Sequence, residues 1–195
     1  PEFFQGRTFG ESNEVVTSVL EEVRTKGDAA LRIYGNKFDV AVPATFEVPQ
    51  EELKAAAEKL RIQKRDIYDA LVYSHDLALK FAKLQRNTFT DFEEEIESGI
   101  FAGQKTIPVE TAGCYVPAGR FPLVSTVIMT VTPAIAAGVK NVIMCTPPRV
   151  HPDDKIEAGK SGSGISGKAF VGGKPYADEG IMAAAYICGV NHLYA

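Results

Sequence analysis

The sequence has no tryptophan, few histidines and cysteines, and no surplus of basic residues. Its 21 Lys and Arg stand against 25 Asp and Glu, and the net charge of −4 argues against a nucleic-acid partner, because phosphate binding needs clustered cations. No apolar run reaches the roughly 20 residues that span a bilayer, and no signal-peptide pattern opens the chain. We therefore expect a soluble cytoplasmic protein with no membrane partner.

The scarcity of cysteine and histidine also limits the metal chemistry. The thiols lack CxxC spacing and lie in apolar sequence, which favours buried side chains in a reducing compartment for all three: Cys114, Cys145 and Cys188. The histidines are far apart and form no H-x-x-x-H pair: His75, His151 and His192. A metal contact of His151 through Asp153 or Asp154 is the weaker alternative, so the residues by themselves predict no zinc site.

Composition is that of an ordinary globular protein, with 45% hydrophobic and 24% charged residues, and 195 residues allow one large or two small domains. Up to about residue 85 the apolar residues recur mostly at helical spacing. We predict a helix capped by Ser12 and ending at Gly27, a second from Asp28, a strand at 45–48, and helices at 50–61 and 64–85. Residues 86–110 indicate a hairpin around Ser98-Gly99.

The following stretch has the order strand, turn, helix, strand. A buried strand at 113–116 meets the turn Pro117-Ala118-Gly119, and a second strand is predicted at 141–145. Ser125 or Thr126 would cap the helix between them, and Gly138 would end it. Because ligands bind outside the carboxyl ends of such strands, a small molecule is expected at the turn 117–120.

The last part of the chain is Gly- and Ser-rich. Residues 162–167 match G-x-G-x-x-G, but neither a buried strand nor a good helix flanks them, which favours a flexible loop over a phosphate site. A helix is predicted at 178–188 with Gly189 as its cap. A strand at 192–195 follows, and it would leave a bare sheet edge.

Several of these pieces resemble the histidinol dehydrogenase family. The resemblance rests on YVPAG at 115–119, STVIM at 125–129, PAIAAGVK at 133–140 and TPP at 146–148, and it extends to VRTKGDAAL at 23–31. It implies an α/β fold in which 1–110 form the helix-rich part of an incomplete Rossmann-like domain. Residues 111–195 would then begin a second Rossmann-like parallel-sheet domain, with an insertion at about 151–177. A single α/β domain with an extra helical layer is the alternative.

The resemblance also suggests a cofactor site. The family's motif tyrosine contacts NAD, and Tyr115 matches it, although from spacing alone a strand-end tyrosine is more often part of the core. Pro117 and Gly119 would shape the same pocket through the backbone. Arg120 departs from the family, which has a small residue or Lys there; it is either a solvated surface residue or a contact for an anionic substrate.

The activity implied is an NAD-dependent, zinc-requiring oxidation of L-histidinol to L-histidine by a homodimer. The family's zinc ligands and its Glu–His pair follow a V-G-G-A-Q-A stretch that would come after Ala195. The resemblance therefore covers the N-terminal portion only, and we expect this chain alone to be inactive, with no catalytic or metal residue. The alternatives are oxidation of a small anionic alcohol such as sulfopropanediol, or a truncated, non-catalytic binding module.

Overall fold

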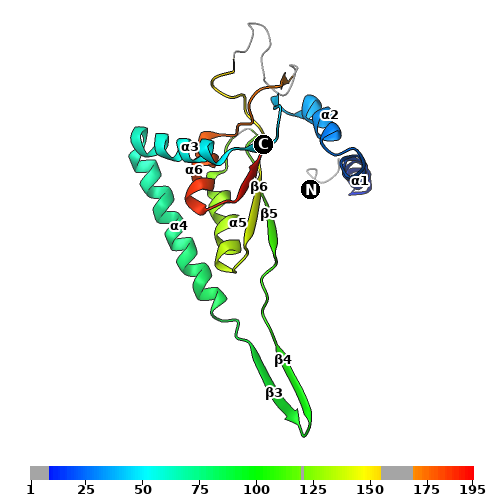
Figure 1. The fold of residues 1–195 in the computed structure, drawn as a ribbon, viewed down its shortest axis with the longest axis vertical. Coiled ribbons are helices and arrows are strands. Elements are labelled where there is room, and N and C mark those ends of the chain that lie inside the picture. Colours follow the sequence, from blue (N-terminus) through cyan, green and yellow to red (C-terminus); the bar gives the residue numbers. More distant parts are fainter. Residues whose placement is uncertain (1–8, 120, 155–168) are drawn as a thin grey trace, which may run out of the picture.

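The fold was obtained as a computed structural model, which describes residues 9–119, 121–154 and 169–195 (Figure 1). The first half contains α1 (Phe9–Lys26), α2 (Asp28–Phe38), β1 (Ala41–Val42), β2 (Glu47–Val48), α3 (Gln50–Gln63) and α4 (Arg65–Arg86). The second half contains β3 (Phe92–Glu97), β4 (Ile100–Gln104), β5 (Thr111–Tyr115), α5 (Val124–Ala136), β6 (Asn141–Cys145), β7 (Phe170–Val171), α6 (Glu179–Cys188) and β8 (His192–Tyr194). Among these residues no helix is both long and apolar enough to cross a membrane.

A four-stranded sheet in the order β2-β8-β6-β5 organises the second half. Strands β5, β6 and β8 are parallel, joined through α5 and α6, so the chain forms two successive βαβ units. The predicted α/β, partly Rossmann-like fold is confirmed. The expectation that the last strand would be a bare edge is wrong, because β2 pairs with β8 in antiparallel fashion and covers it.

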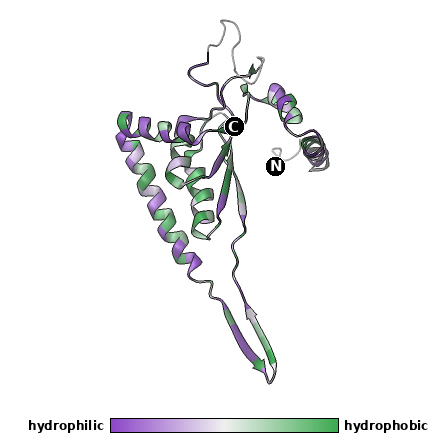
Figure 2. Cartoon of the chain, viewed as in Figure 1, coloured by the Kyte–Doolittle hydropathy of each residue, from purple (hydrophilic) through white to green (hydrophobic). Residues whose placement is uncertain are grey.

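The core lies between one face of this sheet and the helices. Alternate strand residues such as Val142, Met144 and Leu193 are buried there, while their neighbours along the strands are not. Helices α5 and α6 pack together, α3 packs on α6, and α4 packs on α5. Figure 2 shows hydrophobic residues prominent on α5 and β6, with polar residues more frequent on α4 and β3.

Residues before and after the predicted domain boundary at residue 110 pack against each other. Strand β2 belongs to the same sheet as β8, and α3 makes its largest set of contacts with α6. A two-residue parallel pairing also joins β1 to β7. The division into domains 1–110 and 111–195 remains a prediction, and the packing shows that residues 47–86 contribute to the same core as the C-terminal sheet.

The predicted C-terminal ends of α5 and α6, where a glycine follows the helix, agree with the structure. The predicted N-termini of α1 and α5 differ from it. Gly138 and Gly189 have φ values of 89° and 78°, a left-handed conformation that glycine adopts without strain, and they follow α5 and α6. Ser12 lies inside α1, which begins at Phe9. Likewise the N-cap of α5 is Leu123, with no side-chain cap, so Ser125 and Thr126 do not cap it. For α6, the Asp178 carboxylate accepts hydrogen bonds from two backbone N–H groups.

The predicted hairpin is present as β3 and β4, and it projects away from the sheet (Figure 1). Every residue of both strands is exposed. An isolated two-stranded hairpin is marginally stable in water. Its order therefore depends on the backbone ladder and on local contacts, such as the hydrogen bond from the Thr106 N–H to the Asp91 carboxylate.

Close backbone approach at Gly103 makes this hairpin sensitive to one methyl group. A Cβ at this position would lie against the carbonyl oxygen of Phe92 on the opposite strand, far inside van der Waals contact. We expect Gly103→Ala to break the pairing there and to increase amide hydrogen exchange across 92–104, with little effect on global stability because the strands bury nothing.

Gly113→Ala is the matched control for this experiment. A Cβ at Gly113 meets no atom within 4 Å, and its φ is not positive. If Gly103→Ala leaves the hydrogen exchange of residues 92–104 unchanged, the hairpin accommodates the added methyl group, and the close approach of the two strands at Gly103 is contradicted.

Candidate active-site cavity

A cavity of about 740 Å³ opens at the carboxyl ends of the parallel strands. This size lies within the range of small-molecule sites. The strands contribute Tyr115, Cys145 and Tyr194, and residues 146–148 continue the wall beyond β6. The opposite wall comes from α2 and the segment 39–47. A ligand-sized space therefore lies at the carboxyl edge of the sheet, beside Tyr115, although the predicted turn 117–119 is not part of its wall.

Tyr115 is the last residue of β5 and stands in the wall of this cavity. Along β5 the side chain of Cys114 is buried toward the helices, so that of Tyr115 points to the opposite face, where it is 62% exposed. Tyr115 is therefore not a core residue. An accessible aromatic ring with a phenol tip is suited to pack on a planar ligand and to hydrogen-bond it.

The turn after β5 is fixed by side chains from the next strand end. The Thr146 hydroxyl donates to the Val116 carbonyl oxygen at 2.8 Å. The Arg149 guanidinium donates to the carbonyl oxygens of Ala118 and Gly119. Pro117 and Gly119 shape this turn but do not line the cavity wall. Arg120 lies outside the described residues.

The charged groups in the described part of the cavity wall are all carboxylates: Asp28, Asp39 and Glu47. Glu47 lies 2.7 Å from the Nδ1 atom of His192, and Asp28 is exposed at the start of α2. Asp39 is half-buried, and burial raises the pKa of its carboxyl above the usual value. The wall thus carries negative charge and, in its described part, no Lys, Arg or His.

Cys145 corrects the expectation that all three thiols are buried. Cys114 and Cys188 are buried, but Cys145 is exposed in the cavity wall. Burial raises the pKa of the Cys188 thiol to about 11. The prediction failed at Cys145 because the sheet is covered by helices on one face only, and the residue after Met144 points to the other.

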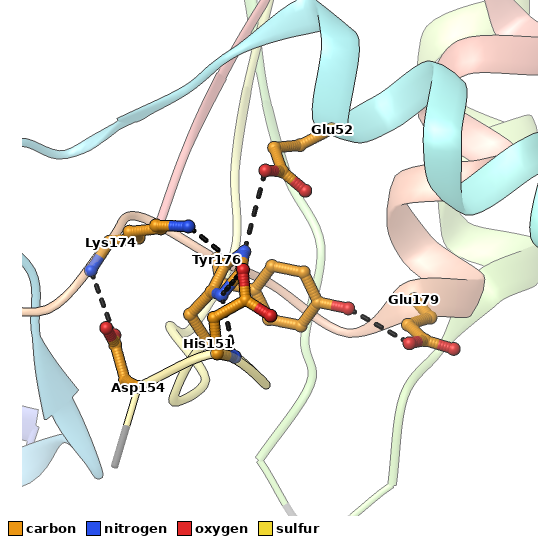
Figure 3. Close-up of polar contacts among 7 residues, drawn as sticks. Glu52, His151, Asp154, Lys174, Tyr176 and Glu179 are labelled. Atoms are coloured by element: carbon orange, nitrogen blue, oxygen red, sulfur yellow. Dashed lines mark hydrogen bonds and ion pairs between the residues drawn. The ribbon is translucent and has the colours of Figure 1, made fainter.

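The base of the 151–177 segment is anchored by a second polar cluster (Figure 3). His151 is buried, and its Nδ1 atom accepts a hydrogen bond from the Asp153 backbone N–H at 3.0 Å. The ring proton is therefore on Nε2, which has no hydrogen-bond partner within the described residues and lies 3.5 Å from a Glu52 carboxylate oxygen. The ring of Tyr176 packs edge-on at 4.8 Å.

Other contacts of this cluster extend to α6. The Tyr176 hydroxyl donates to Glu179, and burial together with this hydrogen bond raises the pKa of the phenol. Asp154 accepts the backbone N–H of Lys174. The predicted loop or flap is therefore held at both ends, while its centre, including the G-x-G-x-x-G match at 162–167, lies outside the described residues.

No zinc site is formed by the residues that the structure describes. Among 9–119, 121–154 and 169–195, no group of three His, Cys, Asp or Glu side chains is placed to hold a metal ion. His151 is also poorly suited as a ligand, because its Nδ1 lone pair already accepts a hydrogen bond and its Nε2 then carries the proton. The zinc that the resemblance implies does not fit this part of the chain.

Comparison with known proteins finds relatives that match nearly the whole chain. The family model for histidinol dehydrogenase matches residues 5–186. A histidinol dehydrogenase of Methanosarcina mazei is 35% identical over 198 aligned positions, which cover 97% of this chain. The chain belongs to the histidinol dehydrogenase family. A crystal structure of histidinol dehydrogenase from Elizabethkingia anophelis superposes with a TM-score of 0.73 at 25% identity, over 97% of this chain.

This chain matches only part of the length of its relatives in the histidinol dehydrogenase family. The chain spans 45% of the Methanosarcina relative and 37% of the Elizabethkingia chain. A sulfopropanediol 3-dehydrogenase of Ruegeria pomeroyi is also 35% identical, over 93% of this chain. The family is thus one of dehydrogenases, and relatives at equal identity are named for different alcohols.

Proposed function

We propose that this chain forms the NAD-binding part of a dehydrogenase of the histidinol dehydrogenase family. The observation that carries the proposal is Tyr115, an exposed aromatic residue in the wall of a cavity at the carboxyl ends of β5, β6 and β8. NAD, when bound, accepts the hydride that leaves the alcohol carbon. Tyr115 would pack on the cofactor, and the turn held by Arg149 would shape the adjoining backbone.

Histidinol is the substrate we propose for the whole protein, and L-histidine its product. A small anionic alcohol is the second candidate, since the sulfopropanediol relative is as similar as the histidinol relative and Arg120 departs from the family pattern. The contribution of this chain is to bind and orient the cofactor. Zinc binding, proton transfer and the homodimer stay predictions for the whole protein, and we expect this chain alone to be inactive.

Tyr115→Ala tests the cofactor site. We expect the dissociation constant of NAD, measured by isothermal titration calorimetry, to rise about tenfold, because an aromatic packing surface and its hydrogen bond are lost. Tyr115→Phe should retain most of the affinity. Tyr73→Ala is the matched control, since Tyr73 is equally exposed but lies on α4, away from the cavity.

Alkylation of Cys145 gives an independent readout of the same experiment. Its thiol is exposed in the cavity wall, whereas Cys114 and Cys188 are buried. NAD should slow the reaction of Cys145 with iodoacetamide in the parent protein and protect less in Tyr115→Ala. Binding of NAD that neither depends on Tyr115 nor protects Cys145 would place the cofactor elsewhere and refute the proposed site.

A further inference from the structure

Helix α4 carries apolar side chains on two opposite faces. One face, on which Ala82 is buried, packs on α5. The other face is open to solvent and bears apolar side chains at i, i+4 and i+7 spacing, each at least half exposed: Leu77, Phe81 and Leu84. A helix that covers a single core needs only one apolar stripe. This second stripe, called the α4 stripe from here on, therefore indicates a further contact.

The β3–β4 hairpin offers apolar side chains of the same kind. Four of them are more than half exposed, in strands that bury no residue: Phe92, Ile96, Ile100 and Phe101. A two-stranded hairpin is marginally stable alone, and packing on another element would stabilise it. The hairpin is thus a second apolar surface that the described part of the chain leaves uncovered.

The charges beside these two surfaces are opposite in sign. Strand β3 carries four carboxylates. They lie beside the apolar side chains of β4, since Glu95 pairs with Phe101 and Glu97 pairs with Ile100. Residues 77–86 of α4 contain no acidic side chain and three basic ones: Lys80, Lys83 and Arg86. Each surface therefore combines apolar side chains with one sign of charge, and the two surfaces are complementary.

Geometry decides which molecule brings the two surfaces together. The hairpin continues beyond the C-terminal end of α4 in nearly the same direction, so it does not lie along α4 of its own chain (Figure 1). Residues 77–86 span about 14 Å of helix, and residues 92–97 span about 17 Å of strand. The two surfaces thus have similar lengths and lie on either side of the connection 87–91. A two-fold axis through this connection would place the hairpin of each copy along α4 of the other.

We propose that a second copy of this chain docks here, with the hairpin 92–104 of each protomer packed on the α4 stripe of its partner. Apolar side chains meet in each contact, and the carboxylates of β3 face the basic side chains of α4. Because the two-fold relation repeats the contact, one interface contains it twice. None of these residues lines the cavity, so the docking surface does not depend on what the cavity binds.

The alternative cover of the α4 stripe is a further part of a longer protein, since the Methanosarcina relative is more than twice as long as this chain. A second copy is favoured because the complementary surface is present in the chain itself and matches the stripe in charge and length. Self-association of this chain, with no further segment attached, distinguishes the two.

Charge reversal on each surface tests the docking by analytical ultracentrifugation. The parent chain should show a concentration-dependent mass that approaches twice its 21.1 kDa. Lys80→Glu with Lys83→Glu makes this part of α4 acidic, like the hairpin. Glu93→Lys with Glu94→Lys and Glu95→Lys makes the hairpin basic, like α4. Either set alone should raise the dissociation constant of the dimer about tenfold or more, because like charges then face each other.

An equimolar mixture of these two variants should restore the dimer. In the mixed dimer the acidic α4 of one variant meets the basic hairpin of the other, and the basic α4 meets the acidic hairpin, so both contacts are attractive. Misfolding cannot account for a dissociation that mixing repairs. Lys37→Glu with Lys54→Glu is the matched control: it makes the same change of charge at exposed positions of α2 and α3, and it should associate as the parent does.

Leu84→Ala separates docking from folding. The truncation removes an apolar side chain from both copies of the contact, so the dissociation constant of the dimer should rise about tenfold. At a dilution where the chain is monomeric, urea unfolding should be unchanged, because Leu84 is exposed in the single chain. Equal association of Leu84→Ala and the parent would exclude the α4 stripe from the interface.

The other failures are also distinct. A parent chain that stays monomeric at every accessible concentration overturns the proposal, and another segment or protein then covers α4. A dimer that survives both charge reversals has its interface elsewhere, which refutes the proposal as well. Dissociation by both reversals without repair on mixing shows that α4 and the hairpin do not meet. None of these results bears on the proposed NAD site, which Tyr115→Ala tests separately.

Discussion

Leu193→Ala should lower the free energy of unfolding by about 2–5 kcal/mol. Leu193 is fully buried at the centre of β8, the strand that lies between β2 and β6. Its side chain belongs to the core between the sheet and the helices, so truncation removes apolar contacts and leaves a cavity that the neighbouring strands cannot close. Since domains are commonly stable by about 5–15 kcal/mol, this is a large part of the total.

Urea unfolding followed by circular dichroism measures this loss. Leu193→Met, which nearly conserves volume, should cost less than about 1.5 kcal/mol. Leu84→Ala makes the same truncation on α4 where the side chain is 62% exposed, and it should stay within about 0.5 kcal/mol. A cost at Leu193 no greater than at Leu84 would mean that β8 does not complete the core in solution.

Much of the fold could be predicted from local pattern. The strand Asn141–Cys145 and the helix Glu179–Cys188 were foreseen within a residue, because a short apolar run and a helical apolar stripe are bounded by proline or glycine. Strand β2 was seen only as an isolated strand. Two residues carry no information on their partner, so its antiparallel pairing with β8 follows from tertiary packing alone.

The N-terminus of α5 shows why capping residues misled. Ser125 and Thr126 are good caps in isolation. In the fold, the Leu123 N–H donates to the Pro117 carbonyl oxygen at 3.1 Å. The Thr126 N–H in turn donates to the Leu123 carbonyl oxygen. The closed turn after β5 thus starts the helix earlier, at Val124.

The residues of the candidate site also differ in whether the sequence could point to them. Tyr115 was predicted as a cofactor contact only through the resemblance to the family, because spacing alone favours a core position for a strand-end tyrosine; the structure places it in the cavity wall. Asp39 and Arg149 were not singled out. Each lies beyond the end of a regular element, and each meets a segment distant in sequence: Asp39 lines the cavity at the sheet end, and Arg149 contacts the 118–119 carbonyls.

Arg149→Ala should lower the free energy of unfolding by about 1.5–3 kcal/mol, because hydrogen bonds from a charged group are lost. The guanidinium donates to two carbonyl oxygens of the turn after β5, and Ala118 is fully buried, so its carbonyl would be left without a partner. The turn should then open, which hydrogen exchange over residues 116–124 would detect. Arg149→Lys should restore only part of the loss: a single nitrogen, Nη2, makes both hydrogen bonds, but the lysine side chain is shorter than that of arginine.

Arg61→Ala is the matched control for this loss. Among the residues that the structure describes, Arg61 pairs only with Glu58, on the exposed surface of α3, and an exposed pair of this kind contributes about 0–1 kcal/mol. If the turn is what joins the two strand ends of the cavity, Arg149→Ala should also weaken NAD binding, whereas Arg61→Ala should not. Loss of stability without faster exchange at 116–124 would show that the turn does not depend on the hydrogen bonds of the Arg149 side chain.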